Sequence, residues 1–388
     1  MKQQNEKNLP SIWLNCAHFI NDTYTGMLNP IMPFIAVKLG ISMAIATVVL
    51  SLSHIFSSLI QPIFGFFADN ITKRAFVFWG ILMTSTFISL APSSKSLLLL
   101  IMFVIAGSMG SSIFHPQALG LSAKFTTSDA AKNMGYFIGM GTLGFAFGPI
   151  VSAGVTQFLG LDKIPVLSLF GVIWALLMFK FVPKISDKFE QIEHKNFTET
   201  FSSIIKNSRL RLLISISILK TLVTTSCTIL LPFLWKGIGK TPFYIGFALF
   251  AFTFAGGIGS LISRKIEQKL GTANVFYISL MATFPLMIIF ALTYKNYSEI
   301  AFGIFVLTGF VTMMAMPITM VLAQSVIPEY KSIIGGFING FSWGIVAVFM
   351  SGIGFLAQAN GIIPVLLTIT FVPIIFTPPV IKKLFSKN

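Results

Sequence analysis

The sequence predicts an all-α integral membrane protein with twelve transmembrane helices in two pseudo-symmetric bundles of six. Three observations carry this prediction: the chain is very apolar, its apolar stretches are long enough to span a bilayer, and its two halves resemble each other. Of 388 residues, 55% are hydrophobic and 10% are charged, with a mean hydropathy of +0.85. A soluble domain has roughly 25% charged residues. Lipid is therefore the solvent for most of the chain, which excludes a soluble enzyme, a fibrous protein and a nucleic-acid-binding protein.

Six apolar stretches fill the first half of the chain, and each is close to the ~20 residues that a membrane-spanning helix needs. They lie at 11–37, 42–68, 75–92, 96–122, 130–158 and 164–182. Glycine, proline or charged residues separate successive stretches and predict the loops between them. In chain order these residues are Gly40, Asp69 with Lys73, Pro92 with Lys95, Lys124 with Asp129, and Gly160 with Asp162.

The second half repeats this pattern after a polar segment at about 183–208. Its six apolar stretches lie at 209–236, 242–264, 272–293, 298–325, 331–358 and 361–381. They are separated by Gly239, by Arg264 to Lys269, and by Lys295, Lys331 and Gly361. We therefore predict three parts: an N-terminal six-helix bundle at 1–182, a cytoplasmic linker at 183–208 and a C-terminal six-helix bundle at 209–388.

Lysine and arginine are distributed unevenly over the predicted loops. Of the 27 basic residues, 20 fall on the side of the N-terminus and one, Lys220, lies inside a span. The six on the opposite side are Lys38, Lys95, Lys163, Lys236, Lys240 and Lys295. Basic residues are enriched on the cytoplasmic side of membrane proteins, so we predict a bacterial cytoplasmic (inner) membrane protein with both termini in the cytoplasm. The net charge of +15 is thus a topology signal rather than the mark of a nucleic-acid partner.

An internal repeat relates the two halves at a nearly constant offset. At a shift of about 199 residues, Pro33 aligns with Pro232, Gly40 with Gly239, and the loop at Asp69 with the loop at Gln268. At a shift of about 201 residues, Pro116 aligns with Pro317, Gly135 with Gly336 and Gly139 with Gly340. Two related six-helix halves are typical of secondary transporters that rock around a site at the bilayer midplane.

Cysteine usage and the N-terminus add two further expectations. Cys16 and Cys227 both lie inside apolar stretches, so they provide neither a disulfide framework nor metal-ligand spacing. We predict no cofactor and no metal. The first residues are too polar for a cleavable signal peptide, which predicts that the first apolar stretch is a retained span.

Two motifs, one in a loop and one in a helix, resemble motifs of the major facilitator superfamily. The loop from Gly65 to Arg74 reads GFFADNITKR, with Gly65, Asp69, Lys73 and Arg74 in the positions of that superfamily's loop motif. The predicted fifth span contains Gly135, Gly144, Gly148 and Pro149, followed by Ser152 and Ala153, and is similar to the antiporter signature of that superfamily. The resemblance covers essentially the whole chain. It implies the major facilitator fold, transport in the export direction, and a conformational gate formed by Gly65, Asp69, Lys73, Arg74, Gly144, Gly148 and Pro149.

Three further segments resemble the fosmidomycin resistance protein family of drug efflux pumps. They are His18 to Asp22 in the first span, Gly110 to Pro116 in the fourth, and Phe341 to Gly344 in the eleventh. One departure from that family is Gln117, which occupies a position where an acidic residue is expected. The resemblance implies efflux of a small molecule or drug. We also predict that Trp343 of the eleventh span lines the substrate site, with packing in the protein core as the alternative.

Asp22 is the one acidic residue of the chain that the predicted spans place within the membrane. A carboxylate near the midplane costs about 2.5 to 3.5 kcal/mol on insertion scales, so it needs a partner or a water-filled cavity. At 100° per residue, the first span has a single polar stripe. Its members are His18, Asn21, Asp22, Thr25 and Asn29. The alternative is a polar face that packs against another helix without a role in transport.

Similar stripes mark the fourth, seventh and tenth spans, which the superfamily uses to line its central cavity. The residues on or near these stripes that we predict to bind substrate are Ser111, Ser112, Gln117, Lys220, Thr224 and Met316, together with Asn21 and Thr25 of the first span. Lys220 lies nine residues beyond Arg211, about 14 Å into the span, where it could bind an anion, pair with Asp22 or snorkel to the cytoplasmic edge. Pro116 opens the helix beside His115, which can then titrate, bind substrate or remain a satisfied core histidine.

Proton-coupled antiport is the mechanism that these residues predict, with Asp22, His18 and His115 as the proton-coupling group. Substrate and protons would compete for one inner surface as the protein changes the side to which it opens. The alternative function is proton-coupled transport of an anionic metabolite or a siderophore-like carboxylate, which Lys220 would suit. The 6 + 6 repeat argues against an oligomeric channel, and no residue set supports an enzyme. We expect a monomer with small-molecule, proton and lipid partners.

Overall fold

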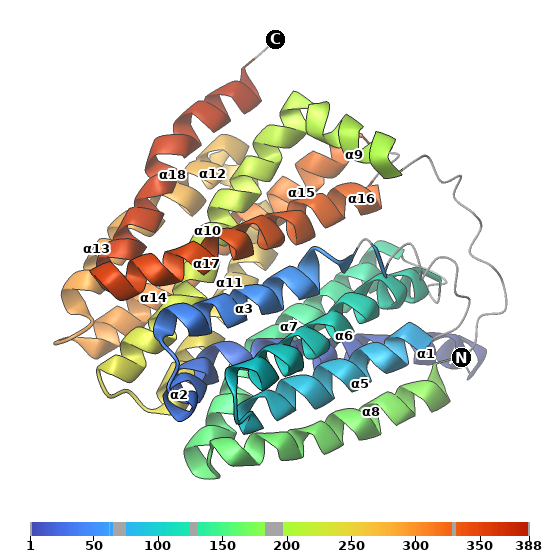
Figure 1. The fold of residues 1–388 in the computed structure, drawn as a ribbon. Coiled ribbons are helices and arrows are strands. Elements are labelled where there is room, and N and C mark those ends of the chain that lie inside the picture. The colour runs from blue at the N-terminus through green and yellow to red at the C-terminus, as the bar shows by residue number, and fades with distance from the viewer. Residues whose placement is uncertain are drawn as a thin grey trace. The chain divides into compact units, whose positions relative to one another are not determined.

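The computed structural model describes residues 2–61, 63–64, 75–124, 130–182, 197–327 and 331–386, and these residues form a series of helices (Figure 1). Within these ranges, ten helical segments are long and apolar enough to cross a membrane. They match ten of the twelve predicted spans. The predicted span at 11–37 corresponds to two helices, and that at 42–68 to a shorter apolar helix, Met43–Ser58, so the count of twelve is not fully confirmed.

The N-terminal helices follow the predicted order. They are α1 (Lys2–Gly26), α2 (Leu28–Leu39), α3 (Met43–Ser58), α5 (Ala75–Leu90), η1 (Ala91–Ser93), α6 (Leu97–Lys124), α7 (Ala130–Phe158), η2 (Leu161–Val166) and α8 (Leu167–Phe181). Gly40 adopts φ 64° at the end of α2, and Gly160 adopts φ 95° after α7. Both are the left-handed or extended positive-φ conformations that glycine allows, which explains why these residues end the spans.

The C-terminal helices repeat this arrangement. They are α9 (Phe197–Lys206), α10 (Ser208–Gly237), α11 (Pro242–Leu270), α12 (Thr272–Met281), α13 (Thr283–Thr293), α14 (Ser298–Met313), α15 (Ala315–Val326), α16 (Lys331–Gly336), the π-helical segment η4 (Phe337–Phe341), α17 (Ser342–Asn360) and α18 (Ile362–Phe385). Part of the predicted polar linker, 197–206, is therefore helical. Asn207 accepts a hydrogen bond from the Leu210 N–H and caps α10, which separates α9 from the span.

Three predicted spans are interrupted near prolines. The first span breaks at Met27, ahead of Pro30 and Pro33, and the ninth breaks at Ala282, ahead of Pro285. Proline has no N–H group and its ring clashes with the carbonyl four residues earlier, so the helix cannot continue unchanged. The spans remain apolar through each break, which is why hydropathy alone predicts them as continuous.

The break in the tenth span shows how the freed backbone group is satisfied. Pro317 cannot donate a hydrogen bond to the carbonyl of Met313, and α14 ends there. Ser260 of α11 donates its hydroxyl to that carbonyl at 3.0 Å instead. Backbone groups in a bilayer must be paired within the protein, so a neighbouring serine makes this break tolerable.

The chain divides into two compact units. Unit 1 contains 1–42, 49–192 and 241–250, and unit 2 contains 43–48, 193–240 and 251–388. Two short segments thus belong to the unit formed mainly by the other half of the sequence. At the repeat shift of about 199 residues, 43–48 corresponds to 242–247, so the internal repeat relates the two exchanged segments.

Unit 1 is organised by close packing of α1 against α7 and of α5 against α6 and α8 (Figure 1). Glycines on α7 permit the first of these contacts. A Cβ atom on Gly144 would overlap the Phe19 carbonyl oxygen of α1, and one on Gly148 would overlap the Thr23 carbonyl oxygen. The exchanged segment 241–250 also packs here, since a Cβ on Gly246 would overlap Ala153 of α7.

Unit 2 is built around α10, which contacts α12, α14, α15, α17 and α18 (Figure 1). Its buried core is aliphatic and aromatic and includes Leu213, Phe276, Ile318 and Ile338. The surface is also apolar: Leu261 is 84% exposed and Leu292 is 75% exposed. Large exposed aliphatic side chains on spans of high hydropathy indicate that lipid contacts these surfaces.

A surface ion pair links the ends of three elements in unit 1. The Lys38 ammonium at the end of α2 contacts Asp162 of η2 and donates to the Pro92 carbonyl of η1 at 2.9 Å. The Asp162 side chain is 79% exposed. Exposed pairs contribute little, so we expect Asp162→Asn to lower the free energy of unfolding by at most about 1 kcal/mol, measured by denaturant titration in detergent. A loss of several kcal/mol would contradict this expectation.

Candidate functional site

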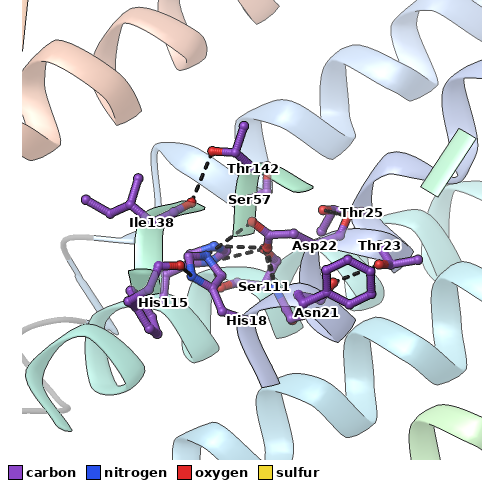
Figure 2. A network of polar contacts seen from close by, with 12 residues as sticks. His18, Asn21, Asp22, Thr23, Thr25, Ser57, Ser111, His115, Ile138 and Thr142 are labelled. Carbon is purple, nitrogen blue, oxygen red and sulfur yellow. Dashed lines mark hydrogen bonds and ion pairs between the residues drawn. The ribbon is translucent and has the colours of Figure 1, made fainter. Parts of the chain in front are cut away.

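Asp22 lies between two histidines inside unit 1 (Figure 2). His18 and Asp22 are one turn apart on α1, and their Nε2 and Oδ2 atoms are 3.2 Å apart. His115 comes from α6, and its Nε2 atom is 3.2 Å from Asp22 Oδ1. Each carboxylate oxygen therefore faces one imidazole nitrogen. The side chains of His18, Asp22 and His115 are 8%, 15% and 25% exposed, and we call these three residues the triad.

Backbone carbonyl groups fix the orientation of both imidazoles. His18 Nδ1 donates to the Phe137 carbonyl at 2.8 Å, and His115 Nδ1 donates to the Ser111 carbonyl at 2.7 Å. A carbonyl oxygen can only accept a hydrogen bond, so each Nδ1 carries a hydrogen atom. The Nε2 atom of each neutral imidazole is then a bare acceptor that points at the carboxylate. Each of the two Nε2–carboxylate contacts therefore needs a proton or a metal cation between its two atoms.

The His18 ring packs closely against α7. The Phe137 ring lies 4.1 Å from it between centroids, and Gly141 packs so closely that a Cβ atom there would overlap the imidazole. The His115 ring meets the His18 ring edge-on at 5.1 Å. Phe137 and Gly141 were not among the predicted site residues. Gly141 belongs to the glycine-rich run of the fifth span, and this run was the sequence signal that could have suggested it.

One predicted stripe residue, Asn21, contacts the carboxylate and links it to Ser111, and another, Thr25, contacts the Asp22 backbone. Asn21 is fully buried, and its Nδ2 group donates to Asp22 Oδ1 at 2.9 Å and to Ser111 Oγ at 3.5 Å. Thr25 donates its hydroxyl to the Asp22 carbonyl at 2.8 Å. The structure therefore brings together Asn21, Asp22 and Ser111, as the helical-wheel stripes predict for the first and fourth spans.

Other predicted substrate residues of unit 1 have backbone partners. The Ser112 hydroxyl donates to the Phe56 carbonyl of α3. The Gln117 Oε1 atom accepts from the Val77 N–H in the first turn of α5, at 3.0 Å, and this side chain is 2% exposed. Both contacts tie neighbouring helices to α6. For these two residues the described contacts are structural, and a role in substrate binding stays a prediction.

The remaining predicted substrate residues belong to unit 2. Lys220 and Thr224 lie on α10 and are 2% and 1% exposed, whereas Met316 on α15 and Trp343 on α17 are partly exposed. Within the described part of unit 2, no carboxylate pairs with Lys220. Two hydroxyl oxygens on the same helix, those of Thr221 and Thr225, also lack hydrogen-bond partners there.

The predicted gate residues divide into two groups. Gly144, Gly148 and Pro149 lie on α7, where the two glycines form the close crossing with α1. Gly65, Asp69, Lys73 and Arg74 lie outside the described residues. The role of all seven as a gate remains a prediction.

The triad has the composition of a metal-ligand set, which sequence spacing did not predict. One ligand atom from each of His18, Asp22 and His115 lies within 4.8 Å of the other two. His18 and Asp22 are neighbours because of helical spacing, but His115 joins them only through the packing of α6 against α1. The prediction that the chain binds no metal stays a prediction, since these three residues form a donor set without showing that an ion binds there.

Comparison with known proteins places this site in a transporter fold. A family profile described as Major Facilitator Superfamily matches residues 14–383. The chain is 23% identical over 390 residues to the uncharacterized MFS-type transporter YfnC of Bacillus subtilis (strain 168), covering 94% of this chain and 90% of that protein. It is 22% identical over 372 residues to the fosmidomycin resistance protein of Escherichia coli (strain K12), covering 93% of this chain and 89% of that protein.

A solved structure shares the fold. The nucleoside transporter NupG superposes with a TM-score of 0.75 at 15% identity, covering 98% of this chain and 100% of that chain. The resemblance predicted from the loop and helix motifs is confirmed by these matches. Since the family profile covers nearly the whole chain, this protein belongs to the Major Facilitator Superfamily of membrane transporters, which are not enzymes.

Proposed function

We propose that this protein is a proton-coupled antiporter that exports a small molecule or drug, with the triad as its proton-coupling group. Membership of the superfamily makes it a multi-pass secondary transporter. The observation that supports proton coupling is the Asp22 carboxylate, held between two imidazole Nε2 atoms at 3.2 Å on each side. Ionisable residues within membrane spans are costly, and where they occur they commonly serve ion pathways.

The geometry of the triad suits a group that gains and loses protons. Each contact between Nε2 and a carboxylate oxygen can hold one proton, so the proton number can change with little movement of the heavy atoms. Water that enters beside buried ionisable groups changes which protonation state is favoured. A conformational change that wets the triad from one side and dries it from the other would therefore link proton binding to the direction in which the transporter opens.

Export is the direction that the fifth span favours. Its glycines and Pro149 resemble the antiporter signature, and one relative is a fosmidomycin resistance protein. The excess of basic residues in one set of loops supports a location in the bacterial cytoplasmic membrane with both termini in the cytoplasm. One chain contains both related halves of the repeat, so we propose a functional monomer.

Asp22→Asn is expected to abolish proton movement coupled to substrate. Asparagine keeps the size of the side chain but removes the negative charge that the two imidazoles face. Purified protein in vesicles with an internal pH-sensitive dye should dissipate an imposed pH gradient when substrate is added, and the variant should respond no more than empty vesicles. Fosmidomycin is the first probe, and a thermal-shift screen of drugs and organic anions supplies others, because a ligand of the folded state raises apparent stability.

Asp162→Asn provides a matched control for this experiment. It makes the same carboxylate-to-amide change at an exposed position in the same unit. We expect wild-type coupling in this variant. Undiminished substrate-coupled proton flux in Asp22→Asn would refute the proposed role of the triad.

Transport of an anionic substrate is the second candidate, and Lys220 favours it. Its ammonium group is buried in unit 2 without a described carboxylate partner. A buried cation suits a carboxylate or phosphonate group, which would supply both the opposite charge and hydrogen-bond acceptors.

A further inference from the structure

We propose that the triad is a binding site for a divalent first-row transition-metal ion, with Zn²⁺ as the reference ion. His18, Asp22 and His115 supply two imidazole nitrogens and one carboxylate, and their ligand atoms lie within 4.8 Å of one another (Figure 2). Two histidines and a carboxylate form a common ligand set for zinc sites that keep a position open. The proposal rests on this donor geometry and does not depend on proton coupling.

The distances in the triad are close to those that a zinc ion requires. Tetrahedral zinc with ligands at about 2.1 Å separates any two ligand atoms by about 3.4 Å. The two distances between Nε2 atoms and carboxylate oxygens are both 3.2 Å. One ring nitrogen of each histidine lies within 4.8 Å of the other, so a rotation of the His115 side chain, which is 25% exposed, can complete the ligand triangle.

The hydrogen bonds to Nδ1 prepare both imidazoles for a metal. A metal-binding histidine typically donates its other ring N–H to a carbonyl or a carboxylate, which fixes the tautomer and the ring orientation. His18 does so with the Phe137 carbonyl, and His115 does so with the Ser111 carbonyl. Both Nε2 atoms therefore present a lone pair to the same carboxylate, an arrangement that one divalent ion would satisfy on both sides.

Further groups suit the remaining coordination position. The Asn21 amide holds Asp22 Oδ1 at 2.9 Å, while the Oδ1 atom of that same amide is buried and has no hydrogen-bond partner among the described residues. A water molecule bound to the metal could donate to it. The 25% exposure of the His115 side chain gives an ion a route into the site. The open position would be taken by water or by a donor atom of the substrate.

The ligand types define which ions the site would accept. Imidazole nitrogens suit Zn²⁺, Co²⁺ and Ni²⁺, whereas Mg²⁺ and Ca²⁺ prefer sites formed entirely by oxygen atoms. The Asp22 carboxylate neutralises half of the ion's charge. We therefore expect saturable binding of Zn²⁺ and Co²⁺ and no comparable binding of Mg²⁺ or Ca²⁺.

The test is equilibrium dialysis of full-length protein in detergent, after removal of any affinity tag and treatment with a chelator. We expect one Zn²⁺ ion per chain and at least a tenfold loss of affinity in His115→Gln and in Asp22→Asn. His54→Gln and His194→Gln are matched controls, because the chain has four histidines and these are the other two. Both controls should retain wild-type affinity. Absence of saturable binding, wild-type affinity in His115→Gln, or equal losses in the controls would overturn the proposal.

A measurement on the unmodified protein keeps the test decisive if a variant does not fold. X-ray absorption of the zinc-loaded protein should show a shell of nitrogen and oxygen atoms near 2.0 Å with scattering from two imidazoles. A sulfur shell would assign the zinc to a cysteine and overturn the proposal. The dialysis experiment measures zinc binding without transport. The vesicle experiment on proton coupling is run with a chelator present, so it measures proton flux without bound metal. Failure of one proposal therefore leaves the other separately testable.

Discussion

Gly144→Ala is expected to lower the free energy of unfolding by about 3 kcal/mol, at the upper end of the usual overpacking cost. The added methyl group would overlap the Phe19 carbonyl oxygen on α1. A backbone oxygen cannot rotate away as a side chain can, so α1 and α7 would have to separate along their contact. Denaturant titration of the purified protein in detergent measures the loss.

Gly139→Ala is the matched control on the same helix. A Cβ atom at Gly139 has no atom within 4 Å, so the new methyl group meets open space. Alanine favours a helix over glycine by up to about 1 kcal/mol, and this variant should be as stable as the wild type or slightly more stable. Equal stability of the two variants would show that the α1–α7 crossing is not as close as described here.

The same crossing connects helix packing to the triad. The α1 helix carries His18 and Asp22, and α7 supplies the Phe137 carbonyl and the Gly141 surface that hold the His18 ring. Separation of these helices by even one methyl radius would lengthen the hydrogen bond to His18 Nδ1. The glycines of the fifth span are therefore needed for the close packing of α7 against α1, whether or not these helices move during transport.

The sequence predicted most of the fold because membrane spans depend on length and apolarity, which can be read directly. It did not predict the breaks at Met27, Ala282 and Met314. Prolines mark all three, but whether a proline bends a span or divides it depends on tertiary partners for the freed carbonyl groups. Ser260, which bonds the Met313 carbonyl from another helix, is such a partner.

The site was predictable in its residue types and only partly in its geometry. Helical spacing alone places His18 one turn from Asp22, and the stripe on the fourth span indicated that His115 faces the interior. The distance from His115 to Asp22 depends on how α1 and α6 pack, which one sequence does not specify. The hydrogen bond from His18 to the Phe137 carbonyl could not be predicted from the sequence. Every residue has a carbonyl group, and only the packing of the helices determines which one lies near His18.

Lys220→Met is expected to stabilise the protein while it removes binding of anionic compounds. The Lys220 side chain is 2% exposed, and its ammonium group has no carboxylate partner in the described part of unit 2. A lysine at the centre of a span costs about 2.5 to 3.5 kcal/mol on insertion scales, and methionine of similar length avoids this cost. We expect a gain of roughly 1 to 3 kcal/mol in the free energy of unfolding.

The Lys220→Met variant distinguishes a lysine that binds substrate from a lysine that stabilises the fold, because stability and anion binding are measured separately. If Lys220 stabilises the fold, its replacement lowers the free energy of unfolding. If Lys220 serves to bind an anionic ligand, its replacement raises the free energy of unfolding and abolishes the thermal shift that organic anions cause. Lys269→Met, at an exposed position near the end of α11, is the matched control and should change neither quantity. If Lys220→Met keeps the anion-induced thermal shift, Lys220 does not bind the substrate, and the anionic-substrate alternative loses its main support.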